Sequence, residues 1–274
     1  MTERANVATE KAPAAGFWRS LLWGSVFKQR GATPPLTDPL HCDTPMLRHA
    51  EIAAVYSGQR VAGDFYEFLR VGPSRMLFVL LDIAGLRADT RKILIAVQKT
   101  FRTLGPELLS GEDINETTAM IELCYAMNLT ILRGGVRSCP AFLGCYNEDL
   151  GTVCYANAGH TPGLLRDRTG ITLLGATGLP LGLFSHTTQS AGACHLVAGS
   201  ALLVVSRGIV EAEYDGADFG LDGAKRSLQD ATALSARDLC LTILESARMS
   251  SSVTPTQNDL TALALVRNAS SVSI

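Results

Sequence analysis

An apolar run that ends on an acid constrains the fold of this chain more than any other feature. Every residue from Met76 to Leu81 is apolar, and Asp82 follows them directly. An apolar run of this length predicts a strand over 75–83 that is buried on both faces. A second acid beside a glycine, in Gly63-Asp64, opens another apolar stretch. The chain is therefore expected to cover both faces of a sheet and to place carboxylates at the ends of its strands.

These two acids have two interpretations. Carboxylates at strand ends are ligands that hard cations such as Mg²⁺ and Mn²⁺ prefer. In the other interpretation, Asp64 is an acid of a hairpin and Asp82 ends a strand and caps the helix that follows. The two residues alone do not decide between these interpretations.

Composition limits the class of protein. With 274 residues, of which 47% are hydrophobic, the chain is long and apolar enough for one large globular domain or two small ones. A formal charge of −2 provides no basic surface for nucleic acid. The seven cysteines are an odd number with no Cys-x-x-Cys pair, which argues against a disulfide framework and against a thiolate zinc site. We therefore expect a cytoplasmic protein.

The first 45 residues differ from the rest. Residues 1–15 are polar and Ala-rich, and 31–45 are rich in proline, so 1–45 is predicted as a disordered or linker segment. Within it, the apolar residues of 17–28, including Trp18 and Trp23, are spaced for a short amphipathic helix that is too short to span a bilayer. This helix is either a peripheral membrane anchor, a contact to a partner or second subunit, or a helix packed on its own domain.

The remaining pattern predicts strands in hairpin order with helices inserted in pairs. Amphipathic spacing predicts helices over 89–104, 113–132, 221–228 and 235–249. Strands are predicted over 48–55, 61–69, 75–83, 141–146, 152–156, 163–166, 171–174, 195–197, 201–205 and 260–266. The first three strands are expected to form a meander. The fold class is therefore α+β, with antiparallel sheets and helices packed outside them.

Four later motifs, taken in order with the two acids, resemble a known family. They are Tyr155-Ala-Asn-Ala-Gly-His160, Thr177-Gly-Leu-Pro-Leu-Gly182, Ser206-Arg-Gly-Ile-Val-Glu-Ala212 and Asn258-Asp-Leu-Thr261. The series resembles the PPM family of metal-dependent serine/threonine protein phosphatases, in the bacterial branch of the stage II sporulation protein E type. The resemblance implies a four-layer αββα sandwich of two antiparallel sheets flanked by helices. It implies a PPM-type phosphatase-like domain over 46–268, followed by a tail over 269–274.

In the resembled family, acidic side chains hold two manganese or magnesium ions that activate a water for direct hydrolysis of a phosphoserine or phosphothreonine. Asp64 matches the acid of the Gly-Gly-Asp motif, and Asp82 matches the acid of the Asp-x-x-Gly-His-Gly motif. The resemblance therefore implies catalytic and metal-binding roles for Asp64 and Asp82, with the backbone of Ile83 as a further ligand.

The second half of the metal site departs from the family. Arg207 stands where the Thr-Asp-Gly motif has its metal-binding acid, and Asn258 stands where the Asp-Asp-x-Thr motif has its first acid. Asp259 follows at the second position, and strand alternation predicts that it points away from the face of Asn258. Asn258 and Asp259 are thus expected to be weak or vestigial ligands. Smaller departures are Ala62 and Leu86-Arg87.

These substitutions change the charge of the site. Asp64 and Asp82 together with Arg207 leave about one net negative charge, too little to concentrate two divalent cations. Arg207 keeps its proton, so it is expected to replace a metal ion beside a carboxylate or to hold a phosphate. The alternative is a surface arginine after a frayed strand.

Two functions follow as expectations. The first is a pseudophosphatase of bacterial signal transduction that has weakened or lost catalysis and regulates a partner by binding. The alternative is an active phosphoric monoester hydrolase that uses manganese or magnesium. In both, the family's usual partners imply a phosphoprotein of the anti-sigma-factor antagonist type, and hence sigma factor regulation. His160 lies in a Gly-Pro turn motif and is assigned no catalytic role.

Overall fold

The structure is a computed structural model that describes residues 44–57, 63–83, 87–186, 188–214, 217–232, 235–249 and 259–269. All of these ranges belong to one compact unit, which spans 36–274. Several predictions lie outside the described residues, namely those for the segment 1–43 with its helix over 17–28, for Ala62, for Leu86, for Asn258 and for the tail beyond 269.

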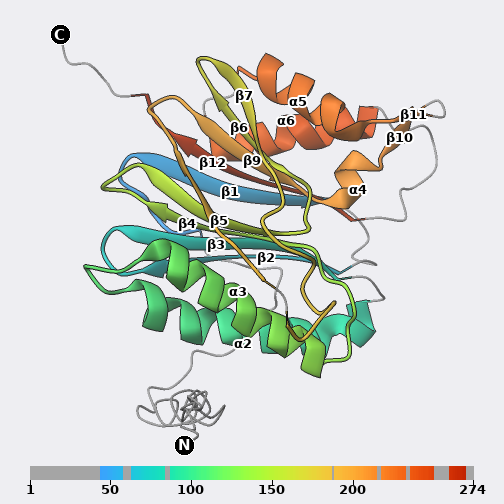
Figure 1. The fold of residues 1–274 in the computed structure, drawn as a ribbon. Coiled ribbons are helices and arrows are strands. Elements are labelled where there is room, and N and C mark those ends of the chain that lie inside the picture. Colours follow the sequence, from blue (N-terminus) through green and yellow to red (C-terminus); the bar gives the residue numbers. More distant parts are fainter. Residues whose placement is uncertain are drawn as a thin grey trace, which may run out of the picture. The chain divides into compact units, whose positions relative to one another are not determined.

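The described strands form two antiparallel five-stranded sheets (Figure 1). The first sheet has the order β1 (Ala50–Ser57), β12 (Leu260–Arg267), β9 (Ala201–Val205), β6 (Gly163–Asp167), β7 (Gly170–Leu174). The second has the order β2 (Gly63–Val71), β3 (Arg75–Ile83), β4 (Ala141–Asn147), β5 (Thr152–Ala158), β8 (Gly192–His195). A small hairpin, β10 (Glu213–Tyr214) with β11 (Ala217–Asp218), stands apart from both sheets.

Two helical layers cover the outer faces of the sheets (Figure 1). Helices α2 (Arg87–Leu109) and α3 (Glu116–Arg133) pack on the second sheet, and α5 (Gly220–Asp230) and α6 (Ala236–Met249) pack on the first. The short helix α4 (Arg207–Val210) follows β9. The predicted four-layer αββα sandwich is therefore confirmed. Among the described residues, no helix is long and apolar enough to cross a membrane.

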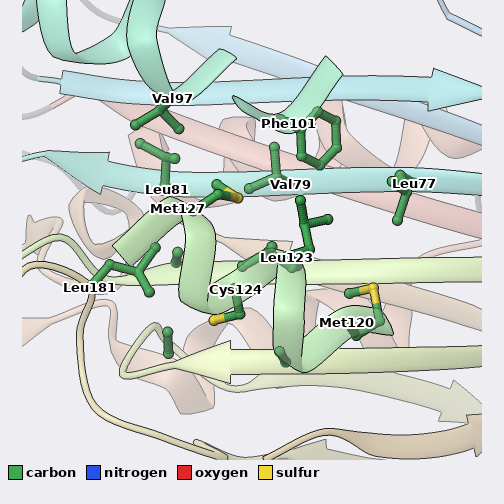
Figure 2. Packing of buried hydrophobic residues seen from close by; sticks show 14 of the residues in the cluster. Leu77, Val79, Leu81, Val97, Phe101, Met120, Leu123, Cys124, Met127 and Leu181 are labelled. Atoms are coloured by element: carbon green, nitrogen blue, oxygen red, sulfur yellow. The ribbon is translucent and has the colours of Figure 1, made fainter. Parts of the chain in front are cut away.

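Three apolar clusters hold the layers together. One lies between the helices α2 and α3 and the second sheet, where Val97 and Phe101 of α2 meet Val79 and Leu81 of β3 (Figure 2). A second fills the space between the two sheets, and a third lies between the first sheet and α5 and α6. Strand β3 contributes residues of alternating parity to two of these clusters, and all nine of its residues are buried. This burial on both faces is what the apolar run of 76–81 predicts.

Strand β1 does not join the meander that the sequence predicts. It pairs along its whole length with β12, so Tyr56 lies opposite Thr261, and β1 belongs to the first sheet. Only β2 and β3 remain as a hairpin of that expected unit. The pairing is decided by burial of β1 between α6 and the other sheet, which involves residues far away along the chain.

Other differences are local. Helix α2 continues through Pro106 to Leu109, where the sequence predicts an end at residue 104. The fully buried side chain of Leu109 stabilises this last turn, which outweighs the one hydrogen bond that proline removes. Strand β8 lies at Gly192–His195 and not at 195–197, because it pairs with Thr152–Tyr155 of β5.

Candidate functional site

Two of the predicted site residues lie opposite each other in the second sheet. Asp64 of β2 pairs with Asp82 of β3, so both side chains lie on the same face of the sheet at the end of the hairpin. Both are buried, with 4% and 8% of their surfaces exposed. Like charges in such a cross-strand pair repel each other, so this pair needs compensation from elsewhere in the fold.

Gly63 allows the strands to approach beside these acids. It pairs with Ile83, and a Cβ atom at position 63 would lie 2.2 Å from the carbonyl oxygen of Ile83. Any side chain there would push β2 away from β3. The backbone of Ile83 is therefore close to Asp64 and Asp82, and its side chain points into the apolar cluster under α2 and α3. The proposed role of the Ile83 carbonyl as a ligand stays a prediction.

The start of β12 brings a second set of polar groups to the acids. Leu263 and Leu265 point into the cluster between the sheets, and Thr261 has the same parity. The Thr261 hydroxyl donates a hydrogen bond of 2.6 Å to Oδ2 of Asp64. Asp259, two residues earlier, is also buried, and its Oδ1 accepts a hydrogen bond of 2.5 Å from the Tyr56 hydroxyl.

Asp259 lies near both predicted site acids. Its charge raises the pKa of Asp64 and also that of Asp82, although burial is the largest cause at each. Asp259 has the same parity as Thr261, so its side chain lies on the side of β12 that faces these acids. The prediction that it faces away from Asn258 involves a residue outside the described ranges. Its second oxygen, Oδ2, is buried without a hydrogen-bond partner.

Ser206 fixes the position of Arg207. Its backbone N–H donates to the carbonyl of Thr261 at 2.8 Å, and its hydroxyl accepts from the Thr261 N–H at 3.0 Å. These bonds join the end of β9 to β12 and start α4 at Arg207. Arg207 is therefore the first residue of a helix beside the acids, and not a residue after a frayed strand.

Arg207 contacts two carboxylates. Its Nε atom lies 3.5 Å from Oδ2 of Asp82 and 3.6 Å from Oε1 of Glu211, one turn later in the chain. The side chain is 58% exposed, so water weakens both ion pairs. The Arg207 guanidinium therefore lies beside Asp82, one of the predicted site acids. The contact is a single long one, and the two groups do not form a bidentate pair.

The electrostatics of the site follow from these contacts. Burial raises the pKa of Asp64 to about 7, the neighbouring charge of Asp82 adds to this effect, and the Thr261 hydroxyl opposes it. Burial also raises the pKa of Asp82, and the Arg207 guanidinium opposes it. Near neutral pH, the site thus holds a carboxyl at Asp64 that exchanges a proton readily.

Features of the described site residues bear on metal binding in opposite directions. The unpartnered Oδ2 of Asp259 is a buried carboxylate oxygen that a cation would stabilise. The Arg207 guanidinium, however, already stands beside Asp82. Within the ranges that the structure describes, no group of three His, Cys, Asp or Glu side chains is arranged to hold a metal ion.

The Asn157 motif has a structural role in the described geometry. The Asn157 side chain accepts a hydrogen bond of 2.8 Å from the His160 backbone N–H and donates to the carbonyls of Thr161 and Leu174. These bonds fix the crossing from β5 in one sheet to β6 in the other. Burial lowers the pKa of His160 to about 4, so this imidazole is neutral near pH 7.

Sequence reasoning missed four residues of the site. Thr261 and Ser206 lie inside the quoted motifs, and their positions at strand ends could have indicated that they belong to the site. Glu211 stood four residues after Arg207, the helical spacing for an ion pair. Tyr56 gave no signal, because its contact with Asp259 depends on the pairing of β1 with β12.

Comparisons with known proteins agree with this architecture. The chain matches the family described as Stage II sporulation protein E (SpoIIE) over residues 72–268. It is 24% identical to protein IcfG of Synechocystis sp. (strain ATCC 27184 / PCC 6803 / Kazusa) over 248 residues, which cover 82% of this chain and 39% of IcfG.

Two solved structures have a similar fold. The RsbU and RsbW domains of Rv1364c from Mycobacterium tuberculosis align with a TM-score of 0.67 and 22% identity, over 82% of this chain and 62% of that one. The PP2C phosphatase domain and regulatory fragment of SpoIIE from Bacillus subtilis align with a TM-score of 0.64 and 17% identity, over 80% and 63%. The chain thus spans less than two thirds of each of these relatives. Because the SpoIIE match covers more than half of this sequence, the chain belongs to the SpoIIE family of PPM-type phosphatase domains.

Proposed function

We propose that this protein is a SpoIIE-type serine/threonine phosphatase domain of bacterial signalling whose catalysis is weakened or lost, and that it regulates a partner by binding. The observation that carries the proposal is the Arg207 guanidinium 3.5 Å from the carboxylate of Asp82. The family depends on magnesium or manganese. A fixed cation at a carboxylate of that site opposes binding of such ions.

The charge balance supports this proposal. Asp64, Asp82 and Asp259 supply three carboxylates, but the pKa of Asp64 is raised to about 7, so near neutral pH it is only partly ionised. Arg207 cancels one further charge and cannot act as a ligand, because it keeps its proton. The remaining negative charge is small compared with that of two divalent cations.

A second candidate is an active phosphatase that uses manganese or magnesium. The unpartnered Oδ2 of Asp259 favours it, because a buried carboxylate oxygen of this kind is stabilised by a cation. Asp64, Asp82 and Asp259 would hold the ion only after their side chains turned toward a common centre, with Arg207 turned toward Glu211. Such an ion would supply Lewis-acid activation of water for hydrolysis of a phosphoester.

We further propose that the partner is a phosphoprotein of the anti-sigma-factor antagonist type. One of the structural relatives contains RsbU and RsbW domains, which supports a place in phosphoprotein signalling. Arg207 remains more than half exposed beside the buried acids, so a phosphate group of a partner can reach its guanidinium.

Calorimetric titration of manganese into the full chain tests the proposal, together with hydrolysis of para-nitrophenyl phosphate. We expect weak or absent binding and a rate near background. Binding of two ions per chain with micromolar affinity, accompanied by turnover, would establish the active phosphatase. A second assay adds a serine-phosphorylated antagonist domain in the presence of manganese. If the chain binds this domain and does not dephosphorylate it, the result would support regulation by binding alone.

A further inference from the structure

We propose that the outer groove between α2 and α3 binds an acidic segment of a partner protein. The groove is a hollow of about 590 Å³ on the solvent side of this helical layer, away from the sheets. Lys92, Lys99 and Arg133 stand at its rim, and Ile93, Ala96 and Gly134 form its floor. This surface is separate from the acids of the candidate site and extends the proposed function to partner recognition.

The rim of the groove carries three positively charged side chains. Lys92, Lys99 and Arg133 are exposed, and within the described part of the chain none of them forms an ion pair. The acids with described side chains on these two helices are Glu107, Glu116 and Glu122. They lie in the C-terminal turn of α2 and the N-terminal half of α3, which is the opposite end of this helix pair.

The floor of the groove is apolar and closely packed. A Cβ atom at Gly134 would lie 2.7 Å from Cγ1 of Ile93, so the glycine keeps the end of α3 close to α2 while leaving space above. Ala96, which also lines the groove, is exposed. A ligand therefore gains from small apolar side chains as well as from negative charge.

The two threonines of the groove are turned toward their own helices. Thr100 donates to the carbonyl of Ala96, Thr130 donates to that of Ala126, and the two hydroxyl oxygens lie 3.0 Å apart. Both hydroxyl protons are therefore donated within the protein, and the remaining lone pairs can only accept hydrogen bonds, so neither threonine can donate to a carboxylate. Recognition is thus left to the cations and the apolar floor.

The spacing of the cations favours a polypeptide. Lys92 and Lys99 are seven residues apart on α2, which corresponds to about 10 Å along the helix axis. This span exceeds the size of one phosphate group and matches carboxylates distributed along a peptide. A membrane surface is too flat to reach the floor of a hollow, and the net charge of −2 opposes nucleic acid.

A direct test uses the full chain and a fluorescein-labelled synthetic peptide of about 14 residues that combines glutamates with leucine and alanine. We expect binding in the micromolar range by fluorescence anisotropy, and amide shifts in ¹⁵N spectra confined to 92–100 and 130–134. The double variant Lys99→Glu with Arg133→Glu should bind at least tenfold more weakly. Arg168→Glu with Arg226→Glu, the same charge change at exposed arginines elsewhere, should bind as the unmodified chain does, apart from a small nonspecific loss.

A further variant and a control peptide test whether binding depends on the groove and on negative charge. Ala96→Trp fills the floor without altering charge and should also weaken binding, while thermal unfolding shows that each variant is folded. The same peptide with glutamine in place of glutamate should bind at least tenfold more weakly. No peptide binding, equal loss in both double variants, or tighter binding of phosphatidylglycerol vesicles or a DNA duplex would each overturn the proposal.

Discussion

Asp64 and Asp82 form a directly opposed cross-strand pair, and each is compensated by a different part of the fold. The Thr261 hydroxyl of β12 donates to Asp64, whereas the Arg207 guanidinium at the start of α4 stands beside Asp82. A neutral donor stabilises a carboxylate less than a cation does. Burial raises the pKa of Asp64 to about 7, and the neutral Thr261 hydroxyl opposes this shift only in part, so Asp64 is partly protonated near neutral pH.

Replacement of this acid should change how stability depends on pH. The folded pKa of Asp64 lies above its ordinary value of 3.8, so its favourable contribution is complete below about pH 4 and is lost as the pH rises through about 7. Asp64→Asn removes this loss. In the presence of a chelator, urea unfolding should show the variant more stable than the unmodified chain at pH 8 by up to about 4 kcal/mol, and this advantage should vanish near pH 4.

Asp230→Asn, at an exposed acid, is the matched control and should leave the pH profile unchanged. A profile for Asp64→Asn that runs parallel to that of the unmodified chain from pH 4 to pH 8 would show that Asp64 is ionised throughout.

Restoring the missing acids should restore affinity for metal. Arg207→Asp removes a cation 3.5 Å from Asp82 and adds a carboxylate, and Asn258→Asp adds another acid at the family's ligand position. The double variant should bind manganese most tightly, followed by Arg207→Asp and then by Asn258→Asp. Titration calorimetry measures the manganese affinity of each variant. Arg207→Asp should raise this affinity more than Asn258→Asp does, because only Arg207→Asp removes a repulsive cation.

Arg226→Asp makes the same change of charge on α5 and should leave manganese affinity unchanged. If the double variant is folded by circular dichroism and binds no manganese at millimolar concentration, these positions do not surround one site.

The buried carboxylate of Glu67 should make Arg102 important for stability. Arg102 Nε donates to Oε1 of Glu67 at 2.6 Å, and Gln98 donates to Oε2 at 2.7 Å, which ties α2 to β2. Arg102→Ala removes the charged partner and should destabilise the fold by about 3 kcal/mol in urea unfolding at pH 7. Arg168→Ala, at an exposed turn, should change stability by less than about 0.5 kcal/mol.

Adding Glu67→Gln to Arg102→Ala should recover part of the loss, because a neutral amide needs less compensation when buried. Equal stability of the single and double variants would assign the loss to packing of the arginine side chain instead.

Removal of residues 1–45 should leave the domain folded. All strands and helices of the described sandwich lie after this cut, as do the Arg48–Asp149 ion pair and the bond from Arg70 to the Met46 carbonyl. Far-ultraviolet circular dichroism and a cooperative thermal transition would check the truncated chain. An insoluble or unfolded product would show that the segment with Trp18 and Trp23 is required by the core.

The sequence by itself determined the local structure and the family. The run from Met76 to Leu81 predicted a strand buried on both faces, and the spacing of Leu94, Val97 and Phe101 predicted the helix that covers it. These predictions held because apolar periodicity reports a local property, the face on which a segment is buried. The order of the motifs likewise indicated the family and hence the four-layer fold, and the positions of Asp64 and Asp82 followed from it.

Only the tertiary structure decided which distant segments meet. Tyr56 and Asp259 are 203 positions apart, and their hydrogen bond exists because β1 pairs with β12 and not with β2. Strand alternation predicts which residues of a strand share a face. It does not predict that the face with Thr261 and Asp259 lies against Asp64. The raised pKa of Asp64 and the exposed position of Arg207 likewise depend on the packing of the two sheets, one of which pairs the first strand, β1, with the last, β12.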